Sequence, residues 1–474
     1  MCLFSVLSSC GRNDCTWQSI LALAIMIDWR GGMREINADA VVIGGGAAGM
    51  IAASVLAKRG KDTVVVTKGF GSTYLSSGCI DVLGYVPTPD RPYVSNPIQG
   101  VKELVRSKPM HPYSLISGGK PDEAVKMVKD SLTHVVSESK KQKIKIDGKP
   151  GENVFLMNSL GTLKPTCLAQ DSMYSGRVPS IKKAVIVGIE GFADFNPVFV
   201  AESVASLAKT FGFDCSLKPA YMKLGTTRLN SRYKAVGDDP NGSTPTSGNF
   251  EWRELRQMMK NRERRNEFIK GLKHLSKKYK TGTVGIPPIF GLDACEELHD
   301  SGVQIFEIPM PFLGGSRLHT LFSRIAKRCG ANIMDGYEVT GVRIIGKKCV
   351  GITAESNLRK IKCNAETFVL STGDILTGLA EKNGKIKEPI FNLIAGDEKA
   401  YKKVKSDVFP KGGHPVFEIG VRVNSGLLPV DERGEEMLSN VHVAGSLLGG
   451  YDYTAEKSGL GVAIATGYTA GVIA

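Results

Sequence analysis

The sequence predicts an α/β protein in which a Rossmann-like nucleotide-binding domain is split around an inserted α+β lobe. Two glycine-dense stretches near opposite ends of the chain lead to this prediction. The first, VVIGGGAAGM, places Gly44, Gly46 and Gly49 in the dinucleotide-binding spacing G-x-G-x-x-G. The second begins at Gly445 and reads GSLLGGYDYTAEKSGLGVA. A chain of 474 residues exceeds what one hydrophobic core supports, so we expect a second lobe between them.

The first glycine stretch lies in a βαβ unit. An apolar strand over 40–43 precedes it, a helix of small residues over 50–58 follows it, and a β-branched strand over 63–67 comes next. In this motif the first glycine permits a tight turn, the second lets the backbone approach a phosphate, and the third lets the helix pack on the strand. Ala47 and Ala48 stand at the start of the helix, where free N–H groups attract the phosphate.

Turn-rich stretches divide the rest of the chain. Four prolines from Pro87 to Pro97 mark a linker, and DDPNGSTPTS over 238–247 marks another. We predict a nucleotide-binding domain made of residues 33–95 and 316–474, an inserted substrate or capping lobe over 96–315, and a non-conforming N-terminal extension over 1–32. Met33 is the expected true start, because the lead MREIN before the first strand has the usual length.

The elements between the glycine stretches follow from apolar periodicity and capping residues. Helices are predicted over 122–137 and 251–279, and KKAVIVGIEGFADF predicts a buried strand that leaves into a glycine loop. A later helix should begin at the N-cap Ser316 and end at the C-cap Gly330. Two β-rich segments then meet at a Gly346–Lys347 turn.

The second glycine stretch separates two cofactor classes. A nicotinamide enzyme completes its Rossmann domain in one continuous segment. A large flavoprotein splits the domain and returns with a small sheet, a Thr-Gly strand end and a C-terminal strand, loop and helix. This chain has the second order of parts, since Thr372 and Gly373 end a strand and a helix of small residues begins near Gly459. We therefore expect a flavin, and we expect something to approach that final helix closely.

The chain beyond residue 38 resembles the B subunits of the anaerobic glycerol-3-phosphate dehydrogenases, within the fumarate reductase-like flavoproteins. The stretches that carry the resemblance are VVIGGGAAGM, TYLSSGCIDVLGY, LGTLKPT, FEIPMPFLGGSRLH and NVHVAGSLLGGYDYTAEKSGLGVA. The resemblance implies quinone-linked oxidation of sn-glycerol 3-phosphate to dihydroxyacetone phosphate in anaerobic respiration and glycerol metabolism. It also implies an FMN cofactor, a catalytic FAD subunit and a membrane-attached iron–sulfur subunit as partners. The location implied is cytoplasmic, held peripherally at the inner face of the membrane through those partners.

The resemblance also implies cofactor contacts in three stretches outside the first glycine loop. These are Ser76, Ser77, Gly78 and Cys79; Thr372 and Gly373; and Gly445, Gly450, Gly459, Gly461 and Val462. The chain departs from the related fumarate reductases in having Asp374 after its Thr-Gly and Ser446 after its Ala-Gly. Asp452 or Glu456 could supply the missing carboxylate to ribityl hydroxyls, or either could cap the final helix.

One expected carboxylate is missing from the first βαβ unit. An acid that binds the adenosine ribose should stand near the end of the second strand, yet Thr67 and Lys68 occupy that place. FMN has no adenosine and needs no such acid, whereas FAD is the alternative cofactor. Lys68 could meet a phosphate of the flavin, point to solvent, or meet the 2′-phosphate of NADP, which the second glycine site disfavours.

Cations are the catalytic candidates, because the implied substrate is a small anion. Arg317 offers a guanidinium fork for a phosphate or carboxylate, and His319 could accept the hydroxyl proton as hydride leaves for the flavin. The alternative is a structural Arg317 and an exposed His319. Cys79 is interpreted as a small neighbour of the flavin rather than a redox thiol. Two other functions stay open: a flavin-bearing relay or scaffold subunit, and a fumarate reductase-like enzyme acting on another small acid.

The charge distribution and the cysteines limit which partners and metal sites we expect. Residues 251–280 hold eleven Lys or Arg and four Glu, which is half of the net charge of +14. This basic amphipathic segment could be a solvated lid helix or contact an acidic partner or anionic membrane, and no accompanying module suggests nucleic acid. The ten cysteines include no C-x-x-C and no metal-ligand spacing, so no metal site is expected and reduced thiols in a cytosolic chain are favoured.

Overall fold

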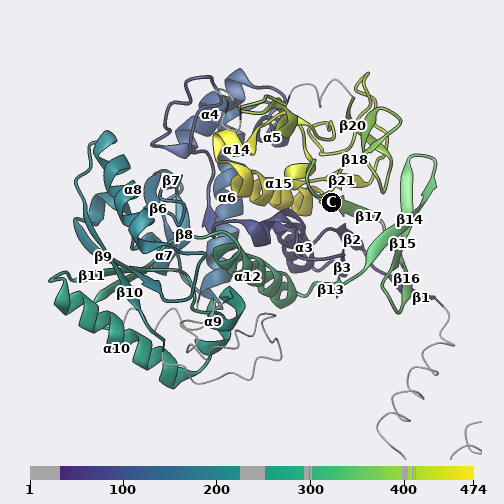
Figure 1. Cartoon of the computed structure of the whole chain (residues 1–474). Helices are drawn as coiled ribbons and strands as arrows, with labels where there is room; N and C mark the ends of the chain where they lie inside the picture. Colours follow the sequence, from purple (N-terminus) through teal and green to yellow (C-terminus); the bar gives the residue numbers. More distant parts are fainter. Residues whose placement is uncertain are drawn as a thin grey trace, which may run out of the picture.

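The structure is a computed structural model that describes residues 33–142, 144–224, 251–292, 298, 301–397, 404–407, 410 and 413–474 (Figure 1). The predicted extension over 1–32 and the predicted link over 238–247 lie outside the described residues.

A five-stranded parallel sheet is the centre of one of the two parts of the molecule. This part is called the first half below, although its strands come from both ends of the chain. Its order is β13 (Asn332–Asp335), β3 (Thr63–Thr67), β2 (Ala40–Ile43), β17 (Thr367–Leu370) and β21 (Val441–Val443). The two strands of the first βαβ unit therefore lie between strands from the last third of the chain. This arrangement confirms the split Rossmann-like fold. The central strands are apolar runs buried on both faces, as parallel sheets require.

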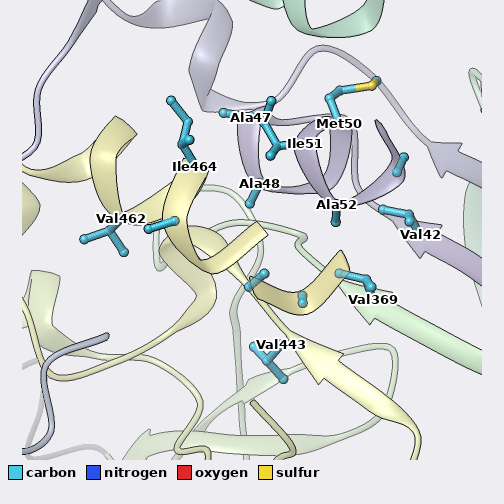
Figure 2. Close-up of a cluster of buried hydrophobic side chains, with 14 of the residues drawn as sticks. Val42, Ala47, Ala48, Met50, Ile51, Ala52, Val369, Val443, Val462 and Ile464 are labelled. Carbon is cyan, nitrogen blue, oxygen red and sulfur yellow. The ribbon is translucent and has the colours of Figure 1, made fainter. Parts of the chain in front are cut away.

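Three helices pack together beside this sheet. Helix α3 (Ala47–Lys58) contacts both α12 (Leu313–Cys329) and α15 (Gly459–Ile473), which lie on either side of it in Figure 1. The glycines of α15 explain its composition, because a Cβ on Gly467 would lie 2.3 Å from the Ala48 carbonyl oxygen. Figure 2 shows Ile464 of α15 next to Ala47 and Ile51 of α3. The close approach expected for the final helix is thus made largely by another helix.

A second parallel sheet forms the core of the inserted part. It runs β10 (Ser216–Met222), β9 (Lys183–Ile189), β11 (Thr283–Ile286) and β12 (Gln304–Glu307), and α8 (Pro197–Thr210) joins β9 to β10. Two separate antiparallel sheets lie between this sheet and the first in the chain order: one has the order β4 (Cys79–Ile80), β8 (Leu168–Gln170) and β5 (Ile146–Gly148), and the other pairs β6 (Val154–Met157) with β7 (Leu163–Thr166). The apolar core of the inserted part is separate from that of the first half.

Three helices after the proline linker belong to the first core rather than to the inserted one. They are α4 (Pro97–Ser107), α5 (Pro112–Ile116) and α6 (Pro121–Lys140), and α6 packs against α15. Their buried residues, including Val101 and Leu132, share one cluster with the central sheet. The apolar core of the inserted part accordingly begins later than residue 96. The three amphipathic helices pack instead on the helices that lie beside the central sheet.

Small sheets and short helices fill the remainder. A four-stranded sheet has the order β1 (Arg34–Asn37), β16 (Lys360–Asn364), β15 (Lys348–Glu355) and β14 (Glu338–Ile345), with the predicted Gly346–Lys347 turn between its last two strands. A three-stranded sheet holds β18 (Ala380–Lys382), β19 (Lys385–Glu388) and β20 (Leu393–Asp397). The short helices are η1 (Ser72–Leu75), α7 (Asp171–Tyr174), η2 (Val178–Ser180), η4 (Pro415–Glu418), η5 (Gly445–Leu447) and α14 (Tyr453–Glu456).

The basic segment is two helices, so the prediction of one continuous helix over 251–279 was wrong. Helix α9 spans Trp252–Met258 and α10 spans Arg262–Lys278. The break occurs because the Asn261 side chain accepts a hydrogen bond from the Arg264 N–H, which caps a new helix. Arg265 donates to the Met259 and Lys260 carbonyls and satisfies the end of α9. The apolar stripe packs inward as expected, with Leu272 fully buried.

Candidate functional site

The loops that follow three neighbouring parallel strands meet at one edge of the central sheet. Ser371 N donates to Ile43 O at 2.8 Å, and Ala444 N donates to Leu370 O at 2.9 Å. These bonds bring Gly44 next to Ser371 and place Gly445 beside the start of α3. The carboxyl ends of the strands in an open α/β sheet are where ligands bind, so this edge is the candidate cofactor site.

The three fingerprint glycines have different surroundings. A Cβ on Gly44 would lie 2.3 Å from Ser371 O, and Gly44 also has a φ of +117°. A Cβ on Gly49 would lie 2.1 Å from Gly44 O. At Gly46, by contrast, the nearest such heavy atom is Thr73 Oγ1 at 3.8 Å. Gly44 and Gly49 are thus required by the turn and by helix–strand packing, whereas Gly46 presents the open backbone that a phosphate can approach.

The start of α3 retains donors for an anion. Ala47 N–H donates to Thr73 Oγ1 at 2.8 Å, and the first turn closes with a 3.0 Å bond from Met50 N to Gly46 O. The N–H groups of Ala48 and Gly49 precede that bond and lie at the positive end of the helix. The sequence did not point to Thr73, because a hydroxyl 26 residues away gives no local signal of its bond to α3.

Two buried hydroxyls at the same edge fit a polar ligand. Ser76 Oγ and Thr372 Oγ1 are buried and have no hydrogen-bond partner among the residues that the structure describes. Burying a hydroxyl without a partner is costly, so such groups normally meet a ligand or water. Both residues are in the predicted cofactor set. The open face of Gly46 and these two hydroxyls therefore fit a flavin carrying a phosphate and polar ring edges.

Thr67 packs against the glycine loop, whereas Lys68 pairs with an acid at the surface. Thr67 Oγ1 donates to Gly69 O at 2.7 Å, and it would lie 2.4 Å from a Cβ on Gly45. Lys68 Nζ pairs with Glu338 Oε1 at 2.9 Å, and the lysine side chain is 73% exposed. The solvent-facing alternative for Lys68 agrees with this geometry.

Arg317 is engaged in a buried ion pair, so the expected open fork for a substrate anion is absent. Its guanidinium donates to both carboxylate oxygens of Glu307, at 2.5 and 2.6 Å, and to Gln170 Oε1 at 2.9 Å. The Arg317 side chain is 1% exposed and that of Glu307 is fully buried. Ser172 Oγ also donates to Glu307 at 2.7 Å. Arg317 therefore joins α12 to β8 and β12, which agrees with the structural alternative.

His319 lies beside the first glycine loop. Its ring packs edge-on against Phe70 at 5.3 Å and near Tyr74 at 6.1 Å, and it makes a hydrogen bond with the Gly45 backbone. Burial lowers the pKa of His319, and the charge of Asp335 and the bond to Gly45 only partly oppose this. A half-buried, neutral imidazole in this position supports the loop and retains the capacity to accept a proton.

Two glycines outside the predicted cofactor set determine where α12 begins. A Cβ on Gly314 would lie 2.0 Å from Ser77 O, and one on Gly315 would lie 2.5 Å from Thr73 O. Helix α12 therefore starts at Leu313, and the prediction of Ser316 as its N-cap was wrong. The glycine pair lets the helix backbone press against the 73–78 loop. Gly330 ends the helix in the left-handed conformation, as predicted.

Cys79 and its neighbours form the wall next to that loop. Gly78 has a φ of +93° and contacts Gly314. Cys79 is 1% exposed, and burial followed by the charge of Asp81 raises the pKa of its thiol to about 12. The thiol therefore stays protonated and unreactive at neutral pH. All described cysteines are free.

The C-terminal stretch lies beside the segment that follows Cys79. Gly445 and Gly450 have φ values of +78° and +88°, and Gly445 N donates to Thr466 Oγ1 at 2.9 Å. Gly461 N donates to Asp81 O at 2.8 Å, and this bond fixes the start of α15 beside the Cys79 wall. Gly373, with a φ of +101°, lies in the loop that follows β17. Val462 is fully buried in the core.

The two acids proposed for ribityl hydroxyls have protein partners. Asp452 Oδ1 caps α14, rather than the final helix, by accepting from Thr454 N and Ala455 N. Glu456 Oε2 accepts from Ser458 Oγ at 2.9 Å and lies 3.1 Å from His111 Nε2. One oxygen of each acid, Asp452 Oδ2 and Glu456 Oε1, is buried without a partner among the described residues.

Asp374, the departure after Thr-Gly, also has a structural use. Its carboxylate accepts from Leu376 N at 3.0 Å and from the Tyr453 hydroxyl at 2.7 Å. It therefore ties the loop after β17 to α14.

Across the described ranges there is no group of three or more His, Cys, Asp or Glu that could hold a metal ion. None of the described helices is both long and apolar enough to cross a bilayer.

Two named proteins match this chain over nearly its whole length. The chain is 29% identical over 448 residues to a Halobacterium salinarum protein named as a probable B subunit of anaerobic glycerol-3-phosphate dehydrogenase, covering 93% of this chain and 98% of that protein. It is 26% identical over 460 residues to the B subunit of the anaerobic glycerol-3-phosphate dehydrogenase of Actinobacillus pleuropneumoniae, covering 92% and 98%.

A solved structure gives a weaker likeness. The 3-ketosteroid-delta4-(5alpha)-dehydrogenase of Rhodococcus jostii RHA1 is 12% identical with a TM-score of 0.37, covering 94% of this chain and 98% of the other.

The model of the family described as FAD binding domain matches residues 39–382, a range that includes the fingerprint glycines, the 73–78 loop and Thr372–Gly373. The chain therefore belongs to the FAD-binding domain family of flavin-dependent oxidoreductases.

Proposed function

We propose that this chain is the B subunit of an anaerobic, quinone-linked glycerol-3-phosphate dehydrogenase, which oxidises sn-glycerol 3-phosphate to dihydroxyacetone phosphate. The observation that carries the proposal is the near end-to-end match to proteins of that name, which covers 98% of their length. The open Gly46 backbone, the α3 N-terminus and the unpartnered Ser76 and Thr372 hydroxyls support a flavin in this chain.

The cofactor proposed is FMN, with FAD as the alternative that the family's description favours. Support for FMN comes from the end of β3, where Thr67 Oγ1 and Gly69 O lie within 2.9 Å of a Cβ on Gly45. Protein atoms thus fill the space next to the loop, and β3 itself ends in Thr67 and Lys68 rather than in an acid that could bind an adenosine ribose. The phosphate would then lie on Gly46, Ala47, Ala48 and Gly49.

The chemistry requires a hydride acceptor and a proton acceptor. A bound flavin supplies the hydride acceptor for the carbon that bears the secondary alcohol. His319 remains the proposed acceptor of the hydroxyl proton, because its lowered pKa keeps the imidazole neutral. Arg317 is proposed as a positioning residue for α12, since its guanidinium is occupied by Glu307. The remaining predicted contacts would surround the same site: Ser76, Ser77, Gly78, Cys79, Thr372, Gly373, Gly445, Gly450, Asp452, Glu456, Gly459, Gly461 and Val462.

The test is to purify the chain, release its flavin, and identify it by chromatography against FMN and FAD standards. Glycerol 3-phosphate is then added anaerobically, and bleaching of the flavin absorption is followed. FMN at one per chain with bleaching by glycerol 3-phosphate supports the whole proposal. FAD at one per chain refutes the FMN part. A flavin that bleaches only when partner subunits are added supports the relay alternative, and bleaching by another small acid but not glycerol 3-phosphate refutes the substrate.

Partner subunits and location are proposed from the same relatives. The catalytic FAD subunit and the membrane-attached iron–sulfur subunit would hold this chain at the cytoplasmic face of the membrane. The basic helix α10 could meet an acidic partner surface there. Raising the salt concentration should weaken such an association, because exposed charges are screened over a Debye length of about 8 Å at physiological ionic strength. Association that is unchanged by salt would contradict a role for these charges.

A further inference from the structure

Three basic residues gather where the C-terminal glycine stretch meets the Cys79 wall. They come from different parts of the chain: Arg91 from the proline linker, Lys164 from β7 and Lys457 from the end of α14. A Cβ on Gly84 would lie 2.7 Å from the Pro165 ring and 3.0 Å from Lys457 Cβ, which shows how closely these segments approach. Desolvation lowers the pKa of Lys457, the positive charges of Lys164 and Arg91 lower it further, and the negative charges of Asp81 and Asp452 oppose this. The three side chains therefore share one electrostatic environment, called the cation cluster below.

Two of the three cations stand on left-handed backbone. Arg91 has a φ of +44° and Lys457 a φ of +52°. Residues with a Cβ adopt such angles uncommonly, at a cost of about 1 kcal/mol or more. Lys457 does so as the C-cap of α14, a position where glycine is common. The chain nevertheless keeps a cation at both positions, with the carboxylates of Asp81 and Asp452 also acting on Lys457.

The protein neutralises the cation cluster only in part. Lys164 forms a partly buried ion pair with Asp81, and Arg91 donates to the Pro410 carbonyl at 3.1 Å. Within the described residues, Asp81 Oδ1 and Arg91 Nε are buried without a hydrogen-bond partner. The unpartnered Arg91 N–H requires an acceptor, such as a phosphate oxygen or water, whereas Asp81 Oδ1 requires a donor and would meet water rather than an anion. Lys457 itself remains open to solvent, so a small molecule can reach the cluster.

The cluster adjoins the candidate flavin site. Asp81 follows Cys79 and Ile80 directly, and its carbonyl accepts the N–H of Gly461 at 2.8 Å. Gly461 and Cys79 both belong to the predicted cofactor contacts. A small molecule whose anionic end lay on the cluster would thus have its other end close to the flavin. The phosphate of the cofactor is expected elsewhere, at Gly46 and the start of α3.

We propose that Arg91, Lys164 and Lys457 form the subsite that binds the phosphate of the substrate, a phosphate monoester of a small alcohol. The inference rests on the proposed function for the identity of that alcohol. It replaces the expectation that Arg317 binds the anion. The function of the cluster is to hold a doubly charged oxyanion while the alcohol carbon faces the cofactor.

The test compares a phosphorylated and an unphosphorylated probe on the purified, flavin-loaded chain. Calorimetry measures binding of dihydroxyacetone phosphate, dihydroxyacetone and inorganic phosphate. Lys457→Gln should weaken binding of both phosphate probes by roughly tenfold or more, the range for one charge-assisted hydrogen bond, and leave flavin content unchanged. Lys347→Gln removes the same charge from an exposed turn and is the matched control. The pair Asp81→Asn with Lys164→Gln tests the second lysine without leaving a buried unpaired acid.

Each outcome decides for or against the subsite. Phosphate binding that Lys457→Gln and the double variant leave at the native level overturns the subsite. Loss of flavin from Lys457→Gln assigns the cluster to the cofactor's phosphate and also overturns it. Native protein that binds neither phosphate probe overturns it too. If Lys457→Gln no longer binds inorganic phosphate while glycerol 3-phosphate fails to bleach the native flavin, the subsite is supported and the proposed substrate is refuted. If glycerol 3-phosphate bleaches both equally at equal KM, the function stands and the subsite falls.

Discussion

Replacing Arg317 by alanine tests whether this residue stabilises the fold or binds a substrate anion. The guanidinium and the Glu307 carboxylate form two parallel bonds of 2.5 and 2.6 Å, and both side chains are buried. Arg317→Ala leaves the Glu307 charge in the interior with the Ser172 hydroxyl among its remaining partners. Breaking a buried pair in this way costs about 3–5 kcal/mol. We therefore expect the free energy of unfolding to fall by that amount.

The assay is urea-induced unfolding followed by circular dichroism and, separately, by flavin release. A second variant, Arg317→Met with Glu307→Leu, removes both charges and should recover most of the lost stability, because apolar replacements of buried pairs are often neutral. An anion-binding Arg317 would behave differently. If Arg317→Ala stays within about 0.5 kcal/mol of the native protein and raises KM for the anionic substrate instead, the structural assignment is refuted.

Three further perturbations follow from the packing. Gly46→Ala should lose flavin while the flavin-free chain keeps its stability, whereas Gly49→Ala should cost about 1–3 kcal/mol from overpacking. Equal flavin content, with equal thermal midpoints of the flavin-free proteins, would contradict both expectations. Gly467→Ala puts a Cβ 2.3 Å from a backbone carbonyl of α3 and should lower the thermal midpoint, while its helical control Gly271→Ala meets only a movable methionine side chain; equal midpoints would contradict the close helix contact. Burial lowers the pKa of His134 from 6.5 to about 4, so between those pH values the unfolded chain binds a proton that the native chain does not, and stability should fall as pH falls through that window. The loss approaches about 3 kcal/mol. Urea unfolding at several pH values measures it, and the His134→Gln variant should lack this dependence of stability on pH. The same pH dependence in the variant would contradict the reasoning.

The central sheet and its split could be predicted because each carries a local signal. Short apolar strands, glycines at fixed spacing and a final helix of small residues are all visible in the sequence. The partners of charged side chains are not visible. Glu307 and Arg317 are ten residues apart, but one lies on β12 and the other on α12, so their pairing depends on how the two lobes meet.

The errors at helix boundaries have a similar cause. Ser316 has the residue type of a good N-cap, yet α12 begins earlier because the 73–78 loop presses on Gly314 and Gly315 from far along the chain. The break before α10 had a local signal in Asn261, but continuous apolar periodicity concealed it. The cation cluster gave no signal at all, since Arg91, Lys164 and Lys457 are brought together only by the fold.

The order of strands in the central sheet constrains how this chain can fold during synthesis. Strand β2 ends at Ile43, and its partner β17 begins only at Thr367, more than 300 residues later. At about 5–20 residues per second, a ribosome needs roughly 15–65 s to bridge that interval. For all of that time the inner edge of β2 has no neighbour, and an apolar unpaired edge can join a strand of another chain. A nascent chain of this design consequently depends on its C-terminal part to close the sheet that its first strands open.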